Sequence, residues 1–458
     1  MSVFQQTLSN LLSPDRIFIM TLKPSRHNII SPLVEGKEYI LVNILSGNAD
    51  IISHQEYQIL TSAPNNDYPS EFIEKGYVVV PEKEDLDYRL KYIEFLEERE
   101  DEEVQLFFVP TYKCNFTCSY CYQSEYPQIQ QRFSREITDA FFRFISEKFA
   151  HRKKYITLFG GEPLLISPEY KNNMAWFIEQ AREHKIDIAI VTNGFNLQEY
   201  LPLLEPEFVR EIQITLDGTA DVHNKRRRLK NNAPTFAAIV ENIDACLDKN
   251  LSVNLRMVVD KENITDLPAL ADFAIARGWT DHPLFKTQIG RNYELHYCQN
   301  GQSLLFNRIS LYEELLRLIK THPQITQFHK PAFSVMKFLQ ENGKLPGALF
   351  DACPACKSEW AMDFTGSIYS CTATVGKPGE KLGTFYPEIT LDDEKIKIWQ
   401  QRDVQHIEEC RDCNLQLICG GGCGSIAFNA NQKILSPDCR PIDSLNSLGA
   451  KAYILPEN

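Results

Sequence analysis

The chain has 458 residues, a formal net charge of −13 at pH 7 and a hydrophobic fraction of 43%. This hydrophobic fraction is large enough for packed cores and excludes general disorder, and the length predicts roughly two to four domains. The sequence has no apolar stretch of about 18 residues, which excludes a membrane-spanning helix, and its acidic balance argues against nucleic-acid binding.

The 13 cysteines are clustered along the chain. Three lie within residues 114–121, eight lie between residues 353 and 439, and Cys246 and Cys298 stand alone. The N-terminus has no basic region followed by an apolar core, so we expect a cytoplasmic protein without a signal peptide, whose thiols stay reduced. Clustered thiols in a reducing compartment indicate metal or iron–sulfur ligation. Cys246 lies in the apolar helical run IDACL and is predicted to be core, whereas Cys298 is either surface or core.

Residues 1–98 contain no cysteine and predict a small α+β domain. Two β-rich runs within Glu38–Ile52 flank a Ser-Gly-Asn-Ala turn, which predicts a hairpin. Two helical segments and a return strand are expected after it, at His54–Leu60, Ser70–Lys75 and residues 76–80. Such a unit is either a recognition module or a structural cap. The charge run Glu94–Glu103 predicts the solvated end of a helix and a domain boundary.

From Val104 onward, strand-like runs alternate with helical patterns, which predicts a parallel α/β sheet or a partial barrel. The predicted strands are Val104–Val109, Tyr155–Phe159, Asp187–Val191, Glu211–Leu216, Val253–Val259 and Leu284–Gln288. The predicted helices lie near residues 134–150, 168–184, 235–249, 266–277 and 303–320. The first four strands are followed by Cys114, Gly160-Gly161-Glu162-Pro163, Thr192-Asn193-Gly194 and Asp217-Gly218. Polar and glycine-rich residues at these strand ends indicate an active site, because parallel α/β folds build their sites there.

Residues 350–458 are loop-rich and contain eight of the cysteines. Their apolar patterning is too sparse for a core of their own, so we expect metal clusters to supply the missing crosslinks.

The first cysteine cluster lies directly after the first strand of the alternating region, in the run TYKCNFTCSYCYQ. Cys114, Cys118 and Cys121 have the spacing C-x3-C-x2-C. Three thiolates can bind three irons of a cubane [4Fe–4S] cluster and leave the fourth iron open, which a catalytic site requires. The alternative is a zinc site.

This cluster resembles the C-x3-C-x-aromatic-C motif of the radical S-adenosylmethionine (SAM) superfamily, with Tyr120 as the aromatic residue. The run Gly160-Gly161-Glu162-Pro163 resembles that family's GGEP loop. The resemblance covers about residues 104–325 and implies a partial (βα)6 barrel, in which SAM chelates the open iron and GGEP orders its amino group. It also implies that an external one-electron reductant, such as flavodoxin or ferredoxin, drives cleavage of SAM to methionine and a 5′-deoxyadenosyl radical.

Three further positions are expected to contact SAM by the same resemblance. Asn193 and Asp217 follow the third and fourth strands, where the family binds SAM. The segment DGTADVHNKRR resembles the family's DG…H…R stretch and makes Arg227 the expected partner of the SAM carboxylate. The alternative for Lys225–Arg228 is a solvated basic run, and His223 is expected only to cap or to pack.

The second cysteine cluster resembles the SPASM domain, an auxiliary-cluster domain found after some radical SAM barrels. The pattern C-x(9–15)-G-x4-C, then C-x2-C-x5-C-x3-C and a final C, is met at every spacing. The resemblance implies two auxiliary [4Fe–4S] clusters, three clusters in total, with one auxiliary cluster on Cys353, Cys356, Cys371 and Cys423 and the other on Cys410, Cys413, Cys419 and Cys439. The alternative is a pair of structural zinc sites.

SPASM enzymes mostly modify peptides or proteins, and residues 1–98 resemble the winged-helix domain that binds leader peptides in such maturases. The resemblances together imply three domains (residues 1–98, 99–325 and 326–458) and a precursor peptide as substrate, with a thioether or carbon–carbon crosslink as product. One departure concerns Thr372, which stands where the sulfatase-maturing branch has an aspartate base. Three alternatives remain: a sulfatase-maturase-like protein oxidation, a small-molecule radical SAM enzyme and a non-catalytic iron–sulfur electron carrier.

Overall fold

The computed structural model describes residues 21–62, 68–121, 129, 131–291 and 304–455. Its centre is a ten-stranded sheet, with neighbouring strands in the order β13 (Phe285–Arg291), β12 (Val253–Val259), β10 (Val209–Thr215), β9 (Ile188–Thr192), β8 (Lys154–Leu158), β6 (Val104–Val109), β14 (Glu359–Asp363), β15 (Ser367–Tyr369), β16 (Gly383–Thr384) and β17 (Thr390–Leu391). The strands from β13 to β14 run parallel, and the last three pairs are antiparallel.

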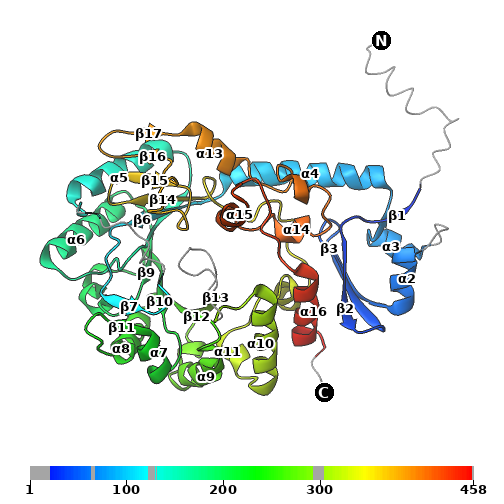
Figure 1. Ribbon diagram of the computed structural model, residues 1–458, viewed down its shortest axis with the longest axis horizontal. Helices are drawn as coiled ribbons and strands as arrows, with labels where there is room; N and C mark the ends of the chain where they lie inside the picture. Colours follow the sequence, from blue (N-terminus) through cyan, green and yellow to red (C-terminus); the bar gives the residue numbers. More distant parts are fainter. Residues whose placement is uncertain (1–20, 63–67, 122–128, 130, 292–303, 456–458) are drawn as a thin grey trace, which may run out of the picture.

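All six predicted strands are present, with bounds shifted by a few residues, and together with β14 they form the parallel part of this sheet. Helices line the outside of the curved sheet (Figure 1), and they are α5 (Arg135–Lys148), α6 (Pro168–Glu183), α8 (Phe236–Asp248), α9 (Leu267–Ala276) and α10 (Arg308–Thr321). The partial barrel that the sequence predicted is therefore confirmed. Cys246 is fully buried within α8, as expected, whereas Cys298 lies outside the described residues.

Alternation along the strands gives the sheet an apolar outer face. Phe108 of β6 packs between Phe141 of α5 and Phe177 of α6, with ring centroids 4.7 and 4.8 Å away. Because successive side chains of a strand point to opposite faces, Gln105 and Phe107 face the inside of the barrel. The inner face is more polar than the outer one, which suits a barrel that admits a substrate.

The N-terminal region forms a separate three-stranded antiparallel sheet in the order β2 (Asn28–Val34), β3 (Glu38–Asn43) and β4 (Asn48–Ser53), followed by α2 (His54–Ser62) and α3 (Ser70–Glu74). The predicted hairpin is β3–β4. Strand β2 contains Pro32, which is tolerated there because β2 lies at the edge of the sheet. The predicted return strand is β5 (Val78–Val79), which pairs with β1 (Lys23–Pro24) and not with the hairpin.

The N-terminal region is joined to the rest by α4 (Pro81–Asp101), which runs across the top of the molecule in Figure 1. The hydroxyls of Tyr88 and Tyr92 on α4 donate to Gln416 and Asp403, each at 2.7 Å. Helix α4 ends at Asp101, close to the boundary expected from the charge run.

The cysteine-rich C-terminal region contains the short helices α13 (Asp393–Gln400), α14 (Gln416–Cys419), α15 (Gly424–Asn431) and α16 (Ile442–Tyr453), and it follows α11 (Ile325–Phe328) and α12 (Met336–Asn342). Its strand β14 joins the barrel sheet beside β6, so this region and the barrel share one continuous sheet. Among the described helices, none combines the length and the hydropathy that a membrane span needs.

Candidate active site at the cysteine loop

The three cysteines of the first cluster lie on the loop that follows β6, residues 110–121, which we call the cysteine loop. Within it, β7 (Phe116–Cys118) pairs antiparallel with β11 (Arg227–Leu229), the strand that follows α7 (Ala220–Arg226). Burial raises the pKa of Cys114 to about 12, and the charges of Glu162, Cys118 and Cys121 add to the rise. The loop therefore brings the three thiols together at the carboxyl end of the sheet.

The Gly-Gly-Glu-Pro run packs directly on the cysteine loop. The backbone N–H of Gly161 donates to Thr111 O at 3.0 Å, and that of Glu162 donates to Lys113 O at 2.9 Å. A Cβ atom on Gly161 would lie 2.1 Å from Lys113 O, so any side chain there would displace the loop. These glycines therefore lie directly against the backbone that carries the cysteines.

Glu162 ties this run to the end of β9. Its carboxylate is 1% exposed and accepts hydrogen bonds from Leu164 N, Thr192 Oγ1 and Asn193 N at 2.7–2.8 Å. Burial raises the pKa of Glu162, and these three donors oppose that rise. The nearby Pro163 accepts a hydrogen bond from the Tyr170 hydroxyl at 3.1 Å, which fixes the exit of the loop.

Asn193 also reaches the cysteine loop. Its amide Nδ2 donates to Asn115 Oδ1 at 2.7 Å and lies 3.8 Å from Cys114 Sγ. The structure thus brings Asn193 to the predicted site.

Asp217 occupies a buried ion-pair network. It is fully buried and accepts hydrogen bonds from Val258 N at 3.1 Å and from Arg226 Nε at 3.4 Å. Arg226 also makes a two-pronged ion pair with Asp260, at 2.9 and 3.0 Å. The protein thus uses both oxygens of Asp217 to join β10, β12 and α7. His223 is fully buried in the same region, as its packing role predicts.

Arg227 is the next residue and makes different contacts from Arg226. It is 8% exposed, pairs with Cys118 in the β7–β11 register and donates from Nη1 to the Tyr120 hydroxyl at 2.7 Å. Its buried Nε has no hydrogen-bond partner among the described residues. A buried guanidinium N–H without an acceptor is a donor available to an anionic ligand.

A cavity of about 1000 Å³ opens beside the cysteine loop. Aromatic rings and the three thiols share its lining, which includes Cys114, Cys118, Cys121, Phe116, Phe133, Tyr170 and Phe364.

Sequence reasoning missed one contact at this cavity. Tyr112, which lines it, donates its hydroxyl proton to Asp363 at the carboxyl end of β14. Asp363 is fully buried, and its other oxygen accepts from Thr365 N at 2.9 Å. No local signal could have found this pair, because only the parallel pairing of β14 with β6 places Asp363 opposite Val109.

The eight C-terminal cysteines influence one another's pKa within two sets. Burial raises the pKa of Cys371 to about 12, with contributions from Cys353 and Cys423, and the charges of Cys371 and Cys353 act on Cys356 in turn. Burial likewise raises the pKa of Cys410 to about 12, with contributions from Cys419, Cys413 and Cys439. The two sets have the same members as those implied by the SPASM resemblance, and their assignment to two clusters stays a prediction.

In the part of the chain that the structure describes, no three His, Cys, Asp or Glu side chains are arranged to hold one metal ion. Thiolates around a cubane cluster bind different irons and stand farther apart than the ligands of a single ion.

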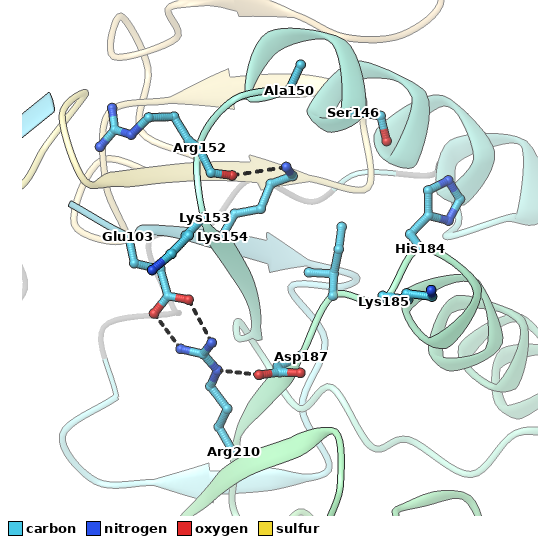
Figure 2. Close-up of a pocket in the computed structure, with 11 residues that line it drawn as sticks. Glu103, Ser146, Ala150, Arg152, Lys153, Lys154, His184, Lys185, Asp187 and Arg210 are labelled. Carbon is cyan, nitrogen blue, oxygen red and sulfur yellow. Dashed lines mark hydrogen bonds and ion pairs between the residues drawn. The ribbon is translucent and has the colours of Figure 1, made fainter. Parts of the chain in front are cut away.

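A second cavity, of about 430 Å³, lies at the amino ends of the parallel strands, and Figure 2 shows the residues that line it. There Arg210 forms ion pairs with Glu103 at 2.6 Å and Asp187 at 2.9 Å. These residues precede or begin β6, β9 and β10, so they clamp the amino ends of the strands together. The cysteine loop follows the carboxyl end of β6, so the length of the strands separates it from this cavity.

Comparisons with known proteins agree with this geometry. A model of the radical SAM superfamily matches residues 108–274. A GTP 3′,8-cyclase of Campylobacter jejuni is 30% identical over 167 residues, which are 36% of this chain and 50% of the cyclase, so the match spans only half of that relative. A serine-type anaerobic sulfatase-maturating enzyme of Bacteroides thetaiotaomicron is 23% identical, over 69% of this chain and 81% of the enzyme.

Two solved structures share the fold. The structure of anSMEcpe with bound AdoMet and the Cp18Cys peptide superposes with a TM-score of 0.55 and 17% identity, over 77% of this chain and 97% of that one. Streptococcus suis SuiB superposes with a TM-score of 0.50 and 15% identity, over 90% of this chain and 98% of that one. The half-barrel and the cysteine loop agree with the matched segment, so residues 108–274 form a radical SAM domain, the kind of enzyme domain that uses a [4Fe–4S] cluster and SAM.

Proposed function

We propose that this protein is a maturase that modifies a ribosomally made precursor peptide by forming a thioether or a carbon–carbon crosslink. The observation that carries the proposal is a three-thiol loop that lines a cavity of about 1000 Å³, in a chain whose C-terminal region carries eight further cysteines. We further propose that the protein works in the cytoplasm with an external one-electron donor.

The residues of the cysteine loop fit the proposed cofactors. Cys114, Cys118 and Cys121 would hold three irons of a [4Fe–4S] cluster, and the free Nε of Arg227 would bind the carboxylate of SAM. The Gly160–Pro163 run, Asn193 and Tyr120 would complete the SAM site, with Asp217 supporting it through Arg226. Bound there, the cluster and SAM supply the radical that removes a hydrogen atom from the substrate.

The two C-terminal sets of cysteines would hold one auxiliary [4Fe–4S] cluster each, since each set offers four thiols. Crosslinking two side chains removes two hydrogen atoms from the peptide, and one leaves with the radical. The second leaves as a proton and an electron, and an auxiliary cluster is a suitable acceptor for that electron.

The N-terminal domain offers an edge for a leader peptide. At the β2 edge, Pro32 O accepts from Ser447 Oγ of α16, and Asn28 O accepts from Asn414 Nδ2 at 3.4 Å, so the C-terminal region covers this edge. At the opposite edge of this sheet, β4 pairs with no described strand other than β3. We therefore propose that a leader adds as a strand to β4.

The experiment is anaerobic incubation of the reconstituted enzyme with dithionite, SAM and the short peptide encoded beside its gene. We expect 5′-deoxyadenosine and a peptide that has lost two hydrogen atoms per crosslink. Cleavage of SAM with no change in the peptide would contradict the proposal.

A second candidate function is sulfatase-maturase-like oxidation of a serine or cysteine. The similarity to the sulfatase-maturating enzyme favours it, and so does a contact at Thr372, whose backbone N–H donates to Glu359 Oε1 at 3.1 Å. A carboxylate thus stands beside the position of the missing aspartate. Formation of an aldehyde on a sulfatase-motif peptide would support this candidate over crosslinking.

A further inference from the structure

Arg256 lies on the inner wall of the barrel, within β12. The flanking Leu255 and Met257 are 1% exposed and belong to the outer core, so by alternation the side chain of Arg256 points to the inside. Arg256 is only partly buried, and Gln288, its register partner on the neighbouring strand β13 (Figure 1), is exposed. The wall is therefore open to solvent here, and the side chain of Arg256 is accessible to a ligand.

Arg256 also lies level with the candidate active site. The residue before it pairs with Ile214 of β10, and Ile214 pairs in turn with Thr192 at the end of β9. Asn193 directly follows Thr192, and its Nδ2 lies 3.8 Å from Cys114 Sγ. Two strand spacings of about 4.8 Å separate β9 from β12, so the backbone of Arg256 is roughly 10 Å from that of Asn193. A residue of a bound peptide is large enough to span this distance.

The guanidinium of Arg256 has few partners in the protein. In the described part of the chain it forms no ion pair, and its Nη1 makes one long hydrogen bond, to Gln213 Oε1 at 3.4 Å. Its Nε is buried and has no hydrogen-bond partner. Lys286 and Glu211, which face the same interior, form an ion pair with each other. Because a partly buried cation is costly without a compensating anion, Arg256 is suited to a ligand that brings a carboxylate.

Two neighbours shape the wall around this guanidinium. A Cβ atom on Gly290 of β13 would lie 3.0 Å from Nη2 and 3.1 Å from Nε of Arg256, so the glycine leaves the space that the guanidinium occupies. Asn254 lies two residues before Arg256 on the same face of β12 and donates from Nδ2 to Glu211 Oε1 at 3.0 Å. Its buried Oδ1 has no partner among the described residues. One free donor and one free acceptor thus stand side by side on the inner wall.

We propose that Arg256 binds the carboxylate of an aspartate or glutamate in the peptide substrate, close to the residue that reacts. The inference rests on the proposed function and adds the class of side chain that the barrel accepts. A guanidinium binds a carboxylate through two parallel N–H donors, and the free Oδ1 of Asn254 suits a main-chain N–H of the same peptide. Arg256 is therefore a positioning residue, and no bond of the carboxylate is made or broken.

The carboxylate of SAM is the other anion expected at this end of the barrel. Arg227 offers it a buried Nε without a partner, and β11, which begins with Arg227, is paired with β7 of the cysteine loop. Arg256 lies on β12, a strand of the barrel wall itself. The two free guanidinium donors thus belong to different elements, and we assign them to different anions.

The test measures how the full-length, reconstituted enzyme binds the core portion of the precursor encoded beside its gene. The labelled core peptide is used without its leader, so that leader binding does not mask the effect, and its acidic residues are changed one at a time to asparagine or glutamine. Arg256→Gln and Arg256→Lys alter the wall. Arg143→Gln is the control, since it removes the same charge from an exposed position on α5, outside the barrel. Fluorescence anisotropy gives the dissociation constant of the peptide, and a separate titration gives that of SAM.

We expect Arg256→Gln to weaken binding of the core peptide at least about tenfold, with Arg256→Lys intermediate and Arg143→Gln like the wild type. One acid-to-amide change in the peptide should cost the wild-type enzyme a similar factor and should cost Arg256→Gln nothing further, because the two groups act on one contact. The dissociation constant for SAM should be the same in all variants.

Equal binding of the core peptide by Arg256→Gln and the wild type would overturn the subsite, and so would losses that simply add in the doubly changed pair. A core without any aspartate or glutamate would also overturn it. Weaker binding of SAM alone in Arg256→Gln would assign this guanidinium to SAM and refute the inference. Cleavage of SAM by the wild type with no change in the precursor would instead contradict the proposed function, and the binding constants would still decide the subsite.

Discussion

At the scale of single residues, the adjacent arginines Arg226 and Arg227 make different contacts. Arg226 and Arg227 are adjacent and both buried, but Arg226 is bound to Asp217 and Asp260, while Arg227 keeps an Nε without an acceptor. Helix α7 ends at Arg226 and strand β11 begins at Arg227, so the two side chains leave the backbone in different directions. The sequence run alone could not say which arginine is free for a ligand.

Gly161 provides a prediction at this scale. Its substitution by alanine places a Cβ atom 2.1 Å from Lys113 O, so the cysteine loop has to move. We expect Gly161→Ala to lower the free energy of unfolding by about 1–3 kcal/mol and to reduce iron uptake at the loop. The measurements are urea unfolding and iron content after reconstitution.

The matched control is Gly347→Ala, because a Cβ atom at Gly347 would meet no atom within 4 Å. It should keep both the stability and the iron of the wild type. Wild-type iron content in Gly161→Ala would show that the glycine is not needed to hold the loop.

At the scale of elements, the edge strand β4 provides a test of leader binding. The N–H of His54 donates to the O of Lys37, the residue directly before β3, so by alternation the N–H of Ile51 points away from β3. Ile51 is 45% exposed, so its side chain contributes little burial. We expect Ile51→Pro to weaken precursor binding at least about tenfold, because proline removes one outward donor and blocks an added strand.

Ile51→Thr is the control, since it keeps the N–H and the β-branched shape. It should bind the precursor like the wild type, and both variants should cleave SAM. Tight binding by Ile51→Pro, measured by fluorescence anisotropy of a labelled precursor, would place the leader elsewhere.

The contact between α4 and the N-terminal sheet predicts a pH dependence. His27 is 1% exposed and stacks on Tyr88 of α4, and burial together with the Arg26 charge lowers its pKa from 6.5 to about 4. The unfolded chain therefore binds a proton between pH 6.5 and about 4 that the folded chain does not bind. Stability that is present above pH 6.5 is lost as the pH falls through this window, by about 3 kcal/mol at most from this residue.

Urea midpoints measured between pH 7 and pH 4.5 check this expectation. His27→Gln should flatten the pH dependence, and His329, whose pKa is also lowered to about 4, should account for part of what remains. An identical pH profile in His27→Gln would show that the buried histidine is not responsible.

At the scale of the whole molecule, the grouping of cysteines predicts the metal content. Three thiol groups should give about twelve irons and twelve sulfides per chain, and replacing Cys114, Cys118 and Cys121 with alanine should leave about eight. The triple variant should also form no 5′-deoxyadenosine, because the C-terminal groups lie in other segments of the chain and do not bind SAM.

Cys246→Ala is the control, since this fully buried thiol belongs to none of the three groups. Its iron content should equal that of the wild type. About four irons in the wild type, or stoichiometric zinc, would contradict the auxiliary clusters.

The sequence alone determined the features that depend on neighbouring residues. Alternation and helical periodicity predicted six of the parallel strands and their helices. They could do so because a strand or helix that buries one face repeats its apolar residues at a regular spacing along the chain. The C-x3-C-x2-C and Gly-Gly-Glu-Pro runs located the cysteine loop and its partner for the same reason, since each motif is one short turn.

The tertiary structure decided what depends on pairing between distant segments. The hydrogen bond between Tyr112 and Asp363 joins residues 251 positions apart, and it exists because β14 adds to the barrel beside β6. The contact of Ser447 with the β2 edge, and the β4 edge that no described strand covers, arise in the same way. The packing of the whole chain decides which distant strands pair, and the local spacing of residues along the sequence does not determine it.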